Sequence, residues 1–306
     1  MIRNIIDLGH YQRKFLRIQK KEGAQAQILS SGSLLRSETQ TSASYWDLLD
    51  QQLHQMKKEW NLGKVPLDCL LPASFFEYSL KKSGNADGET RLETSLEPSL
   101  GTRLNQLLEH KGMEATFLGS GLTSITEFVL RYSSGRRDAS YLLVILTYSC
   151  AYRLLIKEGK ILELELSLEC RGEALDDLIR EKWEKSELPV ESLKSDELIL
   201  LPVYRKEQEM VEGFQRLVPY FHNLLQFLRS SQVFHQSGKN SQKTEILLSD
   251  GGALLRNLSF YLQGILDLPC RVLEPSFFHS SLDNRQDSSD LSIIFNPLLA
   301  HSALVD

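Results

Sequence analysis

Two groups of three short strand-like segments, each followed by a helical pattern, constrain the fold of this chain more than any other feature. The segments of the first group are Asn4 to Leu8, Arg13 to Gln19 and Ala26 to Leu29. Those of the second group are Tyr141 to Thr147, Cys150 to Ile156 and Ile161 to Ser167. Short apolar segments with turn residues between them are typical of neighbouring strands. The repeated order predicts two similar α/β halves within the 306 residues.

Helical patterns follow both groups. Apolar side chains recur every three or four positions from about residue 44 to 60, and Ser44 and Asp47 are spaced like a capping box. The same spacing predicts helices at residues 104–110, 124–132, 172–183, 206–233 and 254–266. Strands are predicted at residues 67–71, 115–118, 244–248, 271–273 and 291–295. We divide the chain into lobes of residues 1–138 and 139–306, with a polar linker at 83–103 and a C-terminal segment that is a candidate to return to the first lobe.

Composition argues against several classes of protein. The 35 basic and 40 acidic residues give a net charge of -5, which argues against nucleic acid as a partner. The four cysteines are scattered without a Cys-x-x-Cys pair, so we expect neither a disulfide framework nor a metal site. The apolar run from Tyr141 to Ile156 is interrupted and too short to span a bilayer, and the first residues lack the apolar core of a signal peptide. We therefore expect a cytoplasmic protein.

Four motifs in a fixed order carry a resemblance to a known family. They are Ile5-Ile-Asp-Leu-Gly-His-Tyr-Gln-Arg-Lys14, Cys170-Arg-Gly-Glu-Ala-Leu-Asp-Asp-Leu-Ile179, Ile246-Leu-Leu-Ser-Asp-Gly-Gly-Ala-Leu-Leu-Arg-Asn-Leu258 and Tyr261-Leu-Gln-Gly-Ile-Leu-Asp-Leu-Pro-Cys-Arg-Val-Leu-Glu-Pro275. Together they resemble PilM and its relatives in the superfamily of actin, FtsA and secretion-platform proteins. The resemblance implies an α/β protein with a duplicated, actin-like (ribonuclease H-like) fold and two lobes around a cleft.

The resemblance also implies where a nucleotide would bind. A glycine turn lets backbone N–H groups approach a phosphate, and an aspartate there organises the water shell of Mg²⁺. The residues that match the family's nucleotide motifs are Asp7, Gly9 and Lys14 in the first phosphate motif, Gly172 at the helix start after the second, and Ser249, Gly251 and Gly252 in the adenosine motif.

Three departures from the family pattern indicate that this nucleotide site is eroded. Bulky residues, beginning with His10, follow the first turn where small ones are usual, and Asp250 replaces the first glycine of the adenosine motif. The aspartate and glycine of the second phosphate motif fall on Ile145 and Thr147. An aliphatic side chain cannot bind the water of Mg²⁺ or align an attacking water. We therefore assign no catalytic residue and no metal ligand and expect no cofactor, with ATP and Mg²⁺ as the alternative.

The resemblance implies a scaffold in a type IV pilus or type II secretion-like assembly platform, and the eroded motifs predict that it is non-catalytic. Such a protein binds the cytoplasmic tail of an inner-membrane partner similar to PilN, and the assembly ATPase is a further expected partner. It would be recruited to the inner face of the inner membrane through that partner. The family's small extra subdomain, which helps form the groove for the tail, is expected to be reduced or absent, because only residues 83–103 occupy its place. Two alternatives stay open: an active Mg-ATP-binding actin-like ATPase or small-molecule kinase, and a nucleotide-dependent cytoskeletal polymer.

Overall fold

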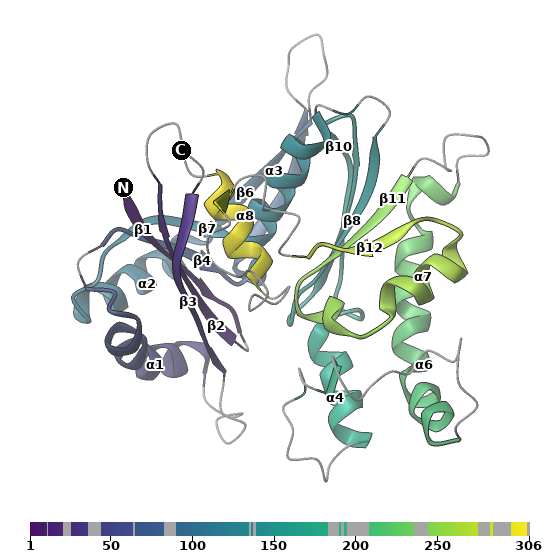
Figure 1. The fold of residues 1–306 in the computed structure, drawn as a ribbon, viewed down its shortest axis with the longest axis horizontal. Helices are drawn as coiled ribbons and strands as arrows, with labels where there is room; N and C mark the ends of the chain where they lie inside the picture. Colours follow the sequence, from purple (N-terminus) through teal and green to yellow (C-terminus); the bar gives the residue numbers. More distant parts are fainter. Residues whose placement is uncertain are drawn as a thin grey trace. The chain divides into compact units, whose positions relative to one another are not determined.

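The chain is an α/β protein that splits into two compact units. The computed structural model describes residues 1–10, 12–20, 26–35, 44–63, 65–82, 90–134, 136, 139–182, 190, 193–194, 208–235, 244–274, 282–283 and 295–304. Unit 1 comprises Met1–Ser79, Glu93–Phe128 and Glu274–Asp306, and unit 2 comprises Leu80–Leu92 and Val129–Leu273. Each unit is built around one mixed sheet (Figure 1).

In unit 1 the described strands form a six-stranded sheet in the order β13-β3-β2-β1-β4-β7. These strands are β1 (Ile2–Leu8), β2 (Gln12–Gln19), β3 (Ala26–Leu35), β4 (Leu67–Leu71), β7 (Ala115–Ser120) and β13 (Leu282–Asp283). The first three strands are antiparallel neighbours, whereas β4 and β7 run parallel to β1 and β13 runs parallel to β3.

In unit 2 the described strands form a five-stranded sheet in the order β10-β9-β8-β11-β12. These strands are β8 (Ser140–Leu146), β9 (Ala151–Lys157), β10 (Lys160–Ser167), β11 (Thr244–Ser249) and β12 (Cys270–Val272). The strands β8 to β10 are antiparallel, and β11 and β12 are parallel to β8. This order and these directions match those of β3-β2-β1-β4-β7 in unit 1. The two similar halves predicted from the sequence are therefore confirmed.

Helices cover the sheets because each helix has an apolar side that packs against the sheet. In unit 1 α1 (Tyr45–Trp60) and α2 (Pro98–His110) cover the face that holds the main core cluster (Figure 1). The α1 helix begins at the predicted cap, because the Ser44 hydroxyl accepts a hydrogen bond from the Asp47 backbone N–H at 3.2 Å. The short α8 (Asn296–Leu304) packs on β1 and β2.

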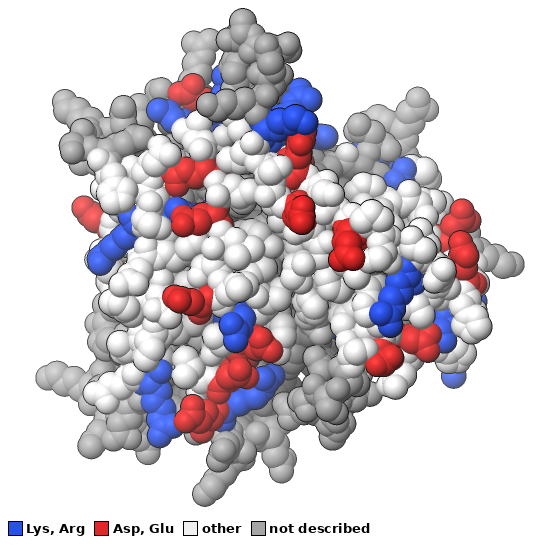
Figure 2. All heavy atoms as spheres, turned by 180° about the vertical axis from the view of Figure 1, so that it is seen from behind, with Lys and Arg blue, Asp and Glu red and all other residues white. Residues whose placement is uncertain are grey.

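Of the remaining described helices, one is divided between the units and three lie in unit 2. They are α3 (Gly121–Ser134), through which the boundary between the units passes, α4 (Gly172–Lys182), α6 (Gln208–Arg229) and α7 (Leu258–Leu266). Short 3₁₀ turns are η2 (Ala73–Phe75), η4 (Gln232–Phe234) and η6 (Gly251–Leu254). Among the described residues, no helix is both long and apolar enough to cross a membrane. Acidic and basic side chains are interspersed on the face seen in Figure 2, so neither sign of charge dominates there.

The structure corrects two predictions about local structure. Where the sequence predicts a polar linker over 83–103, β6 (Thr90–Leu96) pairs with β5 (Phe76–Lys82) in a two-stranded sheet, and α2 already begins at Pro98. The pattern of β6 is mostly polar because most of its side chains are exposed. The helix predicted over 254–266 begins only at Leu258, because Asn257 before it has a left-handed φ of 66°. Residues 291–294 of the last predicted strand lie outside the described residues.

Candidate functional site

Three of the predicted nucleotide-site residues, Asp7, Gly9 and Lys14, lie together at the β1–β2 hairpin of unit 1. The register of the hairpin places Asp7 directly opposite Lys14. Cross-strand neighbours of opposite charge attract each other, and here Nζ of Lys14 lies 2.6 Å from Oδ2 of Asp7. Both side chains are about nine-tenths buried, at 7% and 10% exposed. The lysine therefore neutralises the carboxylate that the family pattern assigns to the Mg²⁺ water shell.

The backbone of this turn is held by side chains of the chain itself. Arg13, which is 1% exposed, donates hydrogen bonds to the carbonyl oxygens of Gly9 and His10 at 2.5 and 3.0 Å. The Tyr45 hydroxyl donates to the Leu8 carbonyl oxygen at 2.8 Å, and the Arg13 guanidinium lies over the Tyr45 ring. Burial raises the pKa of Tyr45, so this hydroxyl stays protonated and continues to donate.

The glycine of this turn has a structural explanation. A Cβ atom on Gly9 would lie 2.8 Å from the carbonyl oxygen of Gln12, which is closer than a carbon and an oxygen can approach without a shift. The bulky His10 that follows packs edge-on against the rings of Tyr45 and Phe75. Its Nε2 atom lies 2.8 Å from the Ser74 hydroxyl. The turn is thus closed by tertiary contacts at the position where small residues are usual in the family.

The other four predicted residues, Gly172, Ser249, Gly251 and Gly252, come together in unit 2 around the end of β8. Ser249 pairs with Ile145 in the sheet and is fully buried. The Gly172 N–H donates to the Thr147 carbonyl oxygen at 2.8 Å, and a Cβ atom on Gly172 would lie only 3.0 Å from that oxygen. A Cβ atom on Gly251, by contrast, would have no described atom within 4 Å.

The two substituted positions of the second phosphate motif lie at the same strand end. Ile145 is fully buried in β8. The Thr147 hydroxyl donates to the Cys150 carbonyl oxygen at 2.6 Å and accepts from the Cys150 N–H at 3.2 Å, which ties it into the β8–β9 turn. Asp250, with a φ of 72°, accepts from the Gly251 N–H at 2.7 Å and so caps η6. The carboxylate and the glycine of the family pattern are therefore replaced by an apolar core residue and a turn residue.

Sequence reasoning missed several charged groups beside this strand end. Asp176 of α4 and Lys194 form an ion pair in which both side chains are almost completely buried. Burial raises the pKa of Asp176 above its ordinary value, and the Lys194 ammonium partly opposes that effect. Burial also raises the pKa of Tyr148 to about 12, and its hydroxyl donates to Glu173 at 3.3 Å. No sequence signal could have found the Asp176 pair, because charges on a helix ordinarily indicate a solvated face.

The described residues at the two phosphate motifs do not fit the water shell of Mg²⁺. The carboxylate of Asp7 is paired with Lys14, and the end of β8 offers no carboxylate at Ile145 or Thr147. Among the described residues, no cluster of three or more His, Cys, Asp or Glu side chains has a geometry that could hold a metal ion. We therefore derive no catalytic step through a nucleotide.

The structure is similar to solved structures with little sequence identity. One is a chain of a PilM–PilN type IV pilus biogenesis complex, with a TM-score of 0.74 and 13% identity over 99% of both chains. The chain has a PilM-like, actin-like fold. Another is MreB5 of Spiroplasma citri bound to AMPPNP, with a TM-score of 0.56 and 11% identity. The match covers 98% of this chain and 94% of the MreB5 chain.

A third match is a Bacteroides thetaiotaomicron protein described as having an actin-like ATPase fold and unknown function. It covers 97% of this chain and 95% of its own, with a TM-score of 0.51 and 10% identity. No protein-family model matches the sequence, and no curated protein sequence is similar to it. The actin-like fold expected from the four motifs is therefore confirmed by structure rather than by sequence similarity.

Proposed function

We propose that this protein is a non-catalytic adaptor of a type IV pilus or type II secretion-like assembly platform. It binds the cytoplasmic tail of an inner-membrane partner similar to PilN, and through that partner it is recruited to the cytoplasmic face of the inner membrane. The assembly ATPase is a second partner. The observation that carries the proposal is the structural match to a PilM–PilN complex chain over 99% of both chains.

The geometry of the two motif regions supports the non-catalytic part of the proposal. The Asp7 carboxylate is neutralised by Lys14, the turn after it is closed by Arg13 and His10, and the end of β8 carries Ile145 and Thr147. Phosphoryl transfer relies on positioned metal ions and on a residue that orients the nucleophile. The pairing of Asp7 with Lys14 and the apolar residue at position 145 therefore support a protein that does not transfer phosphoryl groups.

Calorimetric titration with Mg-ATP tests the absence of a nucleotide function. The purified protein should give no binding heat, and Asp7→Ala should behave like the wild type. The Asp7→Ala variant, once circular dichroism shows that it is folded, is the matched control, because any binding that depends on Mg²⁺ at the first turn would disappear with it. Submicromolar binding that this substitution abolishes would refute the proposal and favour an active ATPase or small-molecule kinase of the same fold.

The alternative of residual ATP binding rests on one observation. The position in front of Gly251 is open, since no described atom lies within 4 Å of a Cβ built there. A backbone without a neighbouring side chain lets a flat ring approach closely. In the same titration, binding that Asp7→Ala leaves intact but Gly251→Val removes would identify a nucleotide bound at the adenosine motif independently of Asp7. The cytoskeletal polymer remains a third hypothesis, and pelleting with ATP tests it.

A further inference from the structure

The duplicated sheets differ at one edge. In unit 1 the third strand of the hairpin series, β3, carries an additional strand on its outer edge, because β13 pairs parallel to it with Leu282 opposite Ala26. The corresponding strand of unit 2 is β10, which stands at the end of the sheet order. Among the described residues no strand pairs with the outer edge of β10. Unit 2 therefore has no described strand beside β10 in the place that β13 occupies beside β3 in unit 1.

Three leucines at or just after β10 are also exposed. Leu162, Leu166 and the following Leu168 are 46, 49 and 59% exposed. Natural edge strands are normally protected by charges, bulges or a covering element, since unpaired backbone groups beside apolar side chains invite another strand. A bulge between Ile161 and Glu163 is present. It leaves the leucines exposed, so an added strand would contact them.

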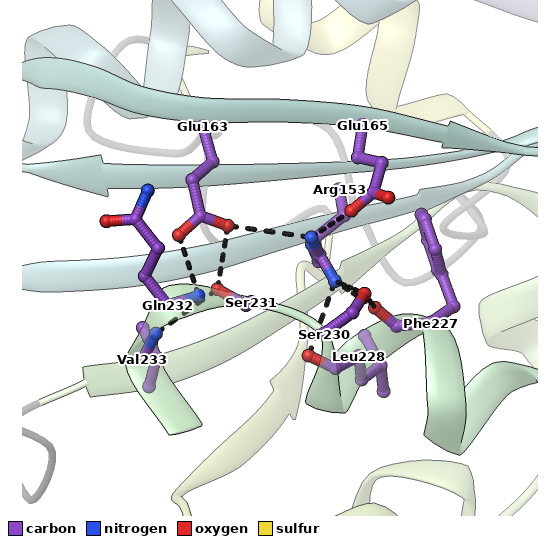
Figure 3. A network of polar contacts seen from close by, with 9 residues as sticks. All are labelled: Arg153, Glu163, Glu165, Phe227, Leu228, Ser230, Ser231, Gln232 and Val233. Atoms are coloured by element: carbon purple, nitrogen blue, oxygen red, sulfur yellow. Dashed lines mark hydrogen bonds and ion pairs between the residues drawn. The ribbon is translucent and has the colours of Figure 1, made fainter. Parts of the chain in front are cut away.

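On the face of β10 opposite the exposed leucines, a polar network connects this strand to β9 and to the end of α6 (Figure 3). Arg153 of β9 is 2% exposed and forms ion pairs with Glu163, at 3.5 Å, and with Glu165. It also donates to the Ser230 hydroxyl at 2.7 Å and to the carbonyl oxygen of Phe227 at the end of α6.

Glu163 extends this network to η4. It accepts hydrogen bonds from the Ser231 hydroxyl and the Gln232 N–H, both at 2.9 Å. The edge strand is thereby tied to the helix layer behind it. A strand that is already ordered loses little conformational entropy when an extended segment pairs with it.

We infer that the outer edge of β10 accepts an extended segment of the inner-membrane partner's tail as an additional strand, parallel to β10 as β13 is to β3. This inference rests on the proposed adaptor function. Strand addition uses backbone hydrogen bonds for affinity and alternate side chains for specificity. The three exposed leucines provide the apolar contacts.

The charge of the edge identifies the chemistry of the segment. Residues 160–169 contain three glutamates and one lysine, and Glu165 and Glu169 are exposed. Cytoplasmic segments that flank membrane spans carry an excess of Lys and Arg. Glu163 and Glu165 already pair with Arg153, so Glu169, just after β10, is the exposed carboxylate that a basic residue would pair with. A tail with apolar residues and a basic residue therefore complements the leucines and Glu169.

The test uses the 306-residue chain and labelled synthetic peptides. The peptides copy the cytoplasmic segments of single-span membrane proteins encoded beside this protein, and binding is followed by fluorescence anisotropy. Leu166→Lys should weaken binding of a peptide about tenfold or more. The substitution removes an apolar side chain that the peptide would bury, and it adds a positive charge that repels the basic peptide. Phe260→Lys, at a residue of α7 that is 68% exposed, is the matched control and should bind normally.

Hydrogen exchange with and without the peptide adds an independent measurement. Amide protons of β10 should exchange more slowly in the complex, because strand pairing gives its outer N–H groups partners. If a peptide binds the wild type and Leu166→Lys equally and protects another region, the edge inference is overturned and the adaptor function stands. If no peptide binds the wild type, both are overturned. A wild type that dimerises in sedimentation, with Leu166→Lys monomeric, would show that a second copy covers the edge instead.

Discussion

The adjacent glycines of η6 offer a sharp test of how unit 2 is packed. A Cβ atom on Gly252 would lie 2.6 Å from the Cβ atom of Leu146 in β8. Carbon atoms in contact normally lie about 3.5–4.0 Å apart, so an added methyl group must push η6 away from the strand by about 1 Å. Gly251 has open space at the corresponding position, and among the described glycines neither of these two has a positive φ.

The two substitutions to alanine should therefore change the free energy of unfolding differently. Overpacking of this kind costs about 1–3 kcal/mol, which is the loss expected for Gly252→Ala. Gly251→Ala meets no obstacle and reduces the entropy of the unfolded chain, so it should be neutral or stabilise by up to about 1 kcal/mol. The variants should be separated by about 2–3 kcal/mol.

Urea unfolding followed by circular dichroism measures this difference. With a slope of about 1–3 kcal/mol per M, the midpoint of Gly252→Ala should fall about 1 M or more below that of Gly251→Ala. Equal midpoints would refute the close approach of η6 to β8. A lower midpoint for Gly251→Ala would show that the two glycines have exchanged roles.

Three further predictions concern buried charges. Arg153→Leu should destabilise the protein by about 3–5 kcal/mol in urea unfolding, since it leaves buried acceptors without their charged donor, and unchanged stability would contradict the network. Lys14→Met should cost a similar amount, because it buries an unpaired Asp7 carboxylate, and Asp7→Asn added to it should restore much of the loss. At Asp68, burial raises the pKa, but hydrogen bonds led by that from His301 outweigh it and hold the pKa below its ordinary value. The stabilisation from Asp68 is therefore present above about pH 4 and lost as the pH falls through the lowered pKa, so Asp68→Asn should flatten the acid side of the stability curve.

The sequence predicted the long, periodic elements well because their apolar faces are regular. The strands of both hairpins and the cap of α1 at Ser44 lie where the pattern places them. The last helix, α8, was missed because seven of its nine residues are buried, so it shows no amphipathic period. The strand β13 is only two residues long, which is too short for any pattern.

The candidate site could be predicted in part only. The glycine positions follow from local motifs, and the structure places Gly172 and Gly252 at one strand end. The pairing of Lys14 with Asp7 depends on the register of a hairpin, which a motif does not specify. The Asp176 and Lys194 pair depends on tertiary packing.

Unit 1 is assembled from segments at both ends of the chain. Its sheet receives α8 on β1 and β2, and His301 of this helix lies 3.2 Å from the carboxylate of Asp68 in β4. A Cβ on Gly121 would lie 2.8 Å from Pro297, which shows how closely this helix is fitted. During synthesis, the part of the chain made first therefore cannot complete its core until residues 296–304 have emerged from the ribosome. Unit 2, whose main segment is continuous, can finish folding earlier, so a nascent chain would pass through a stage in which only its middle is folded.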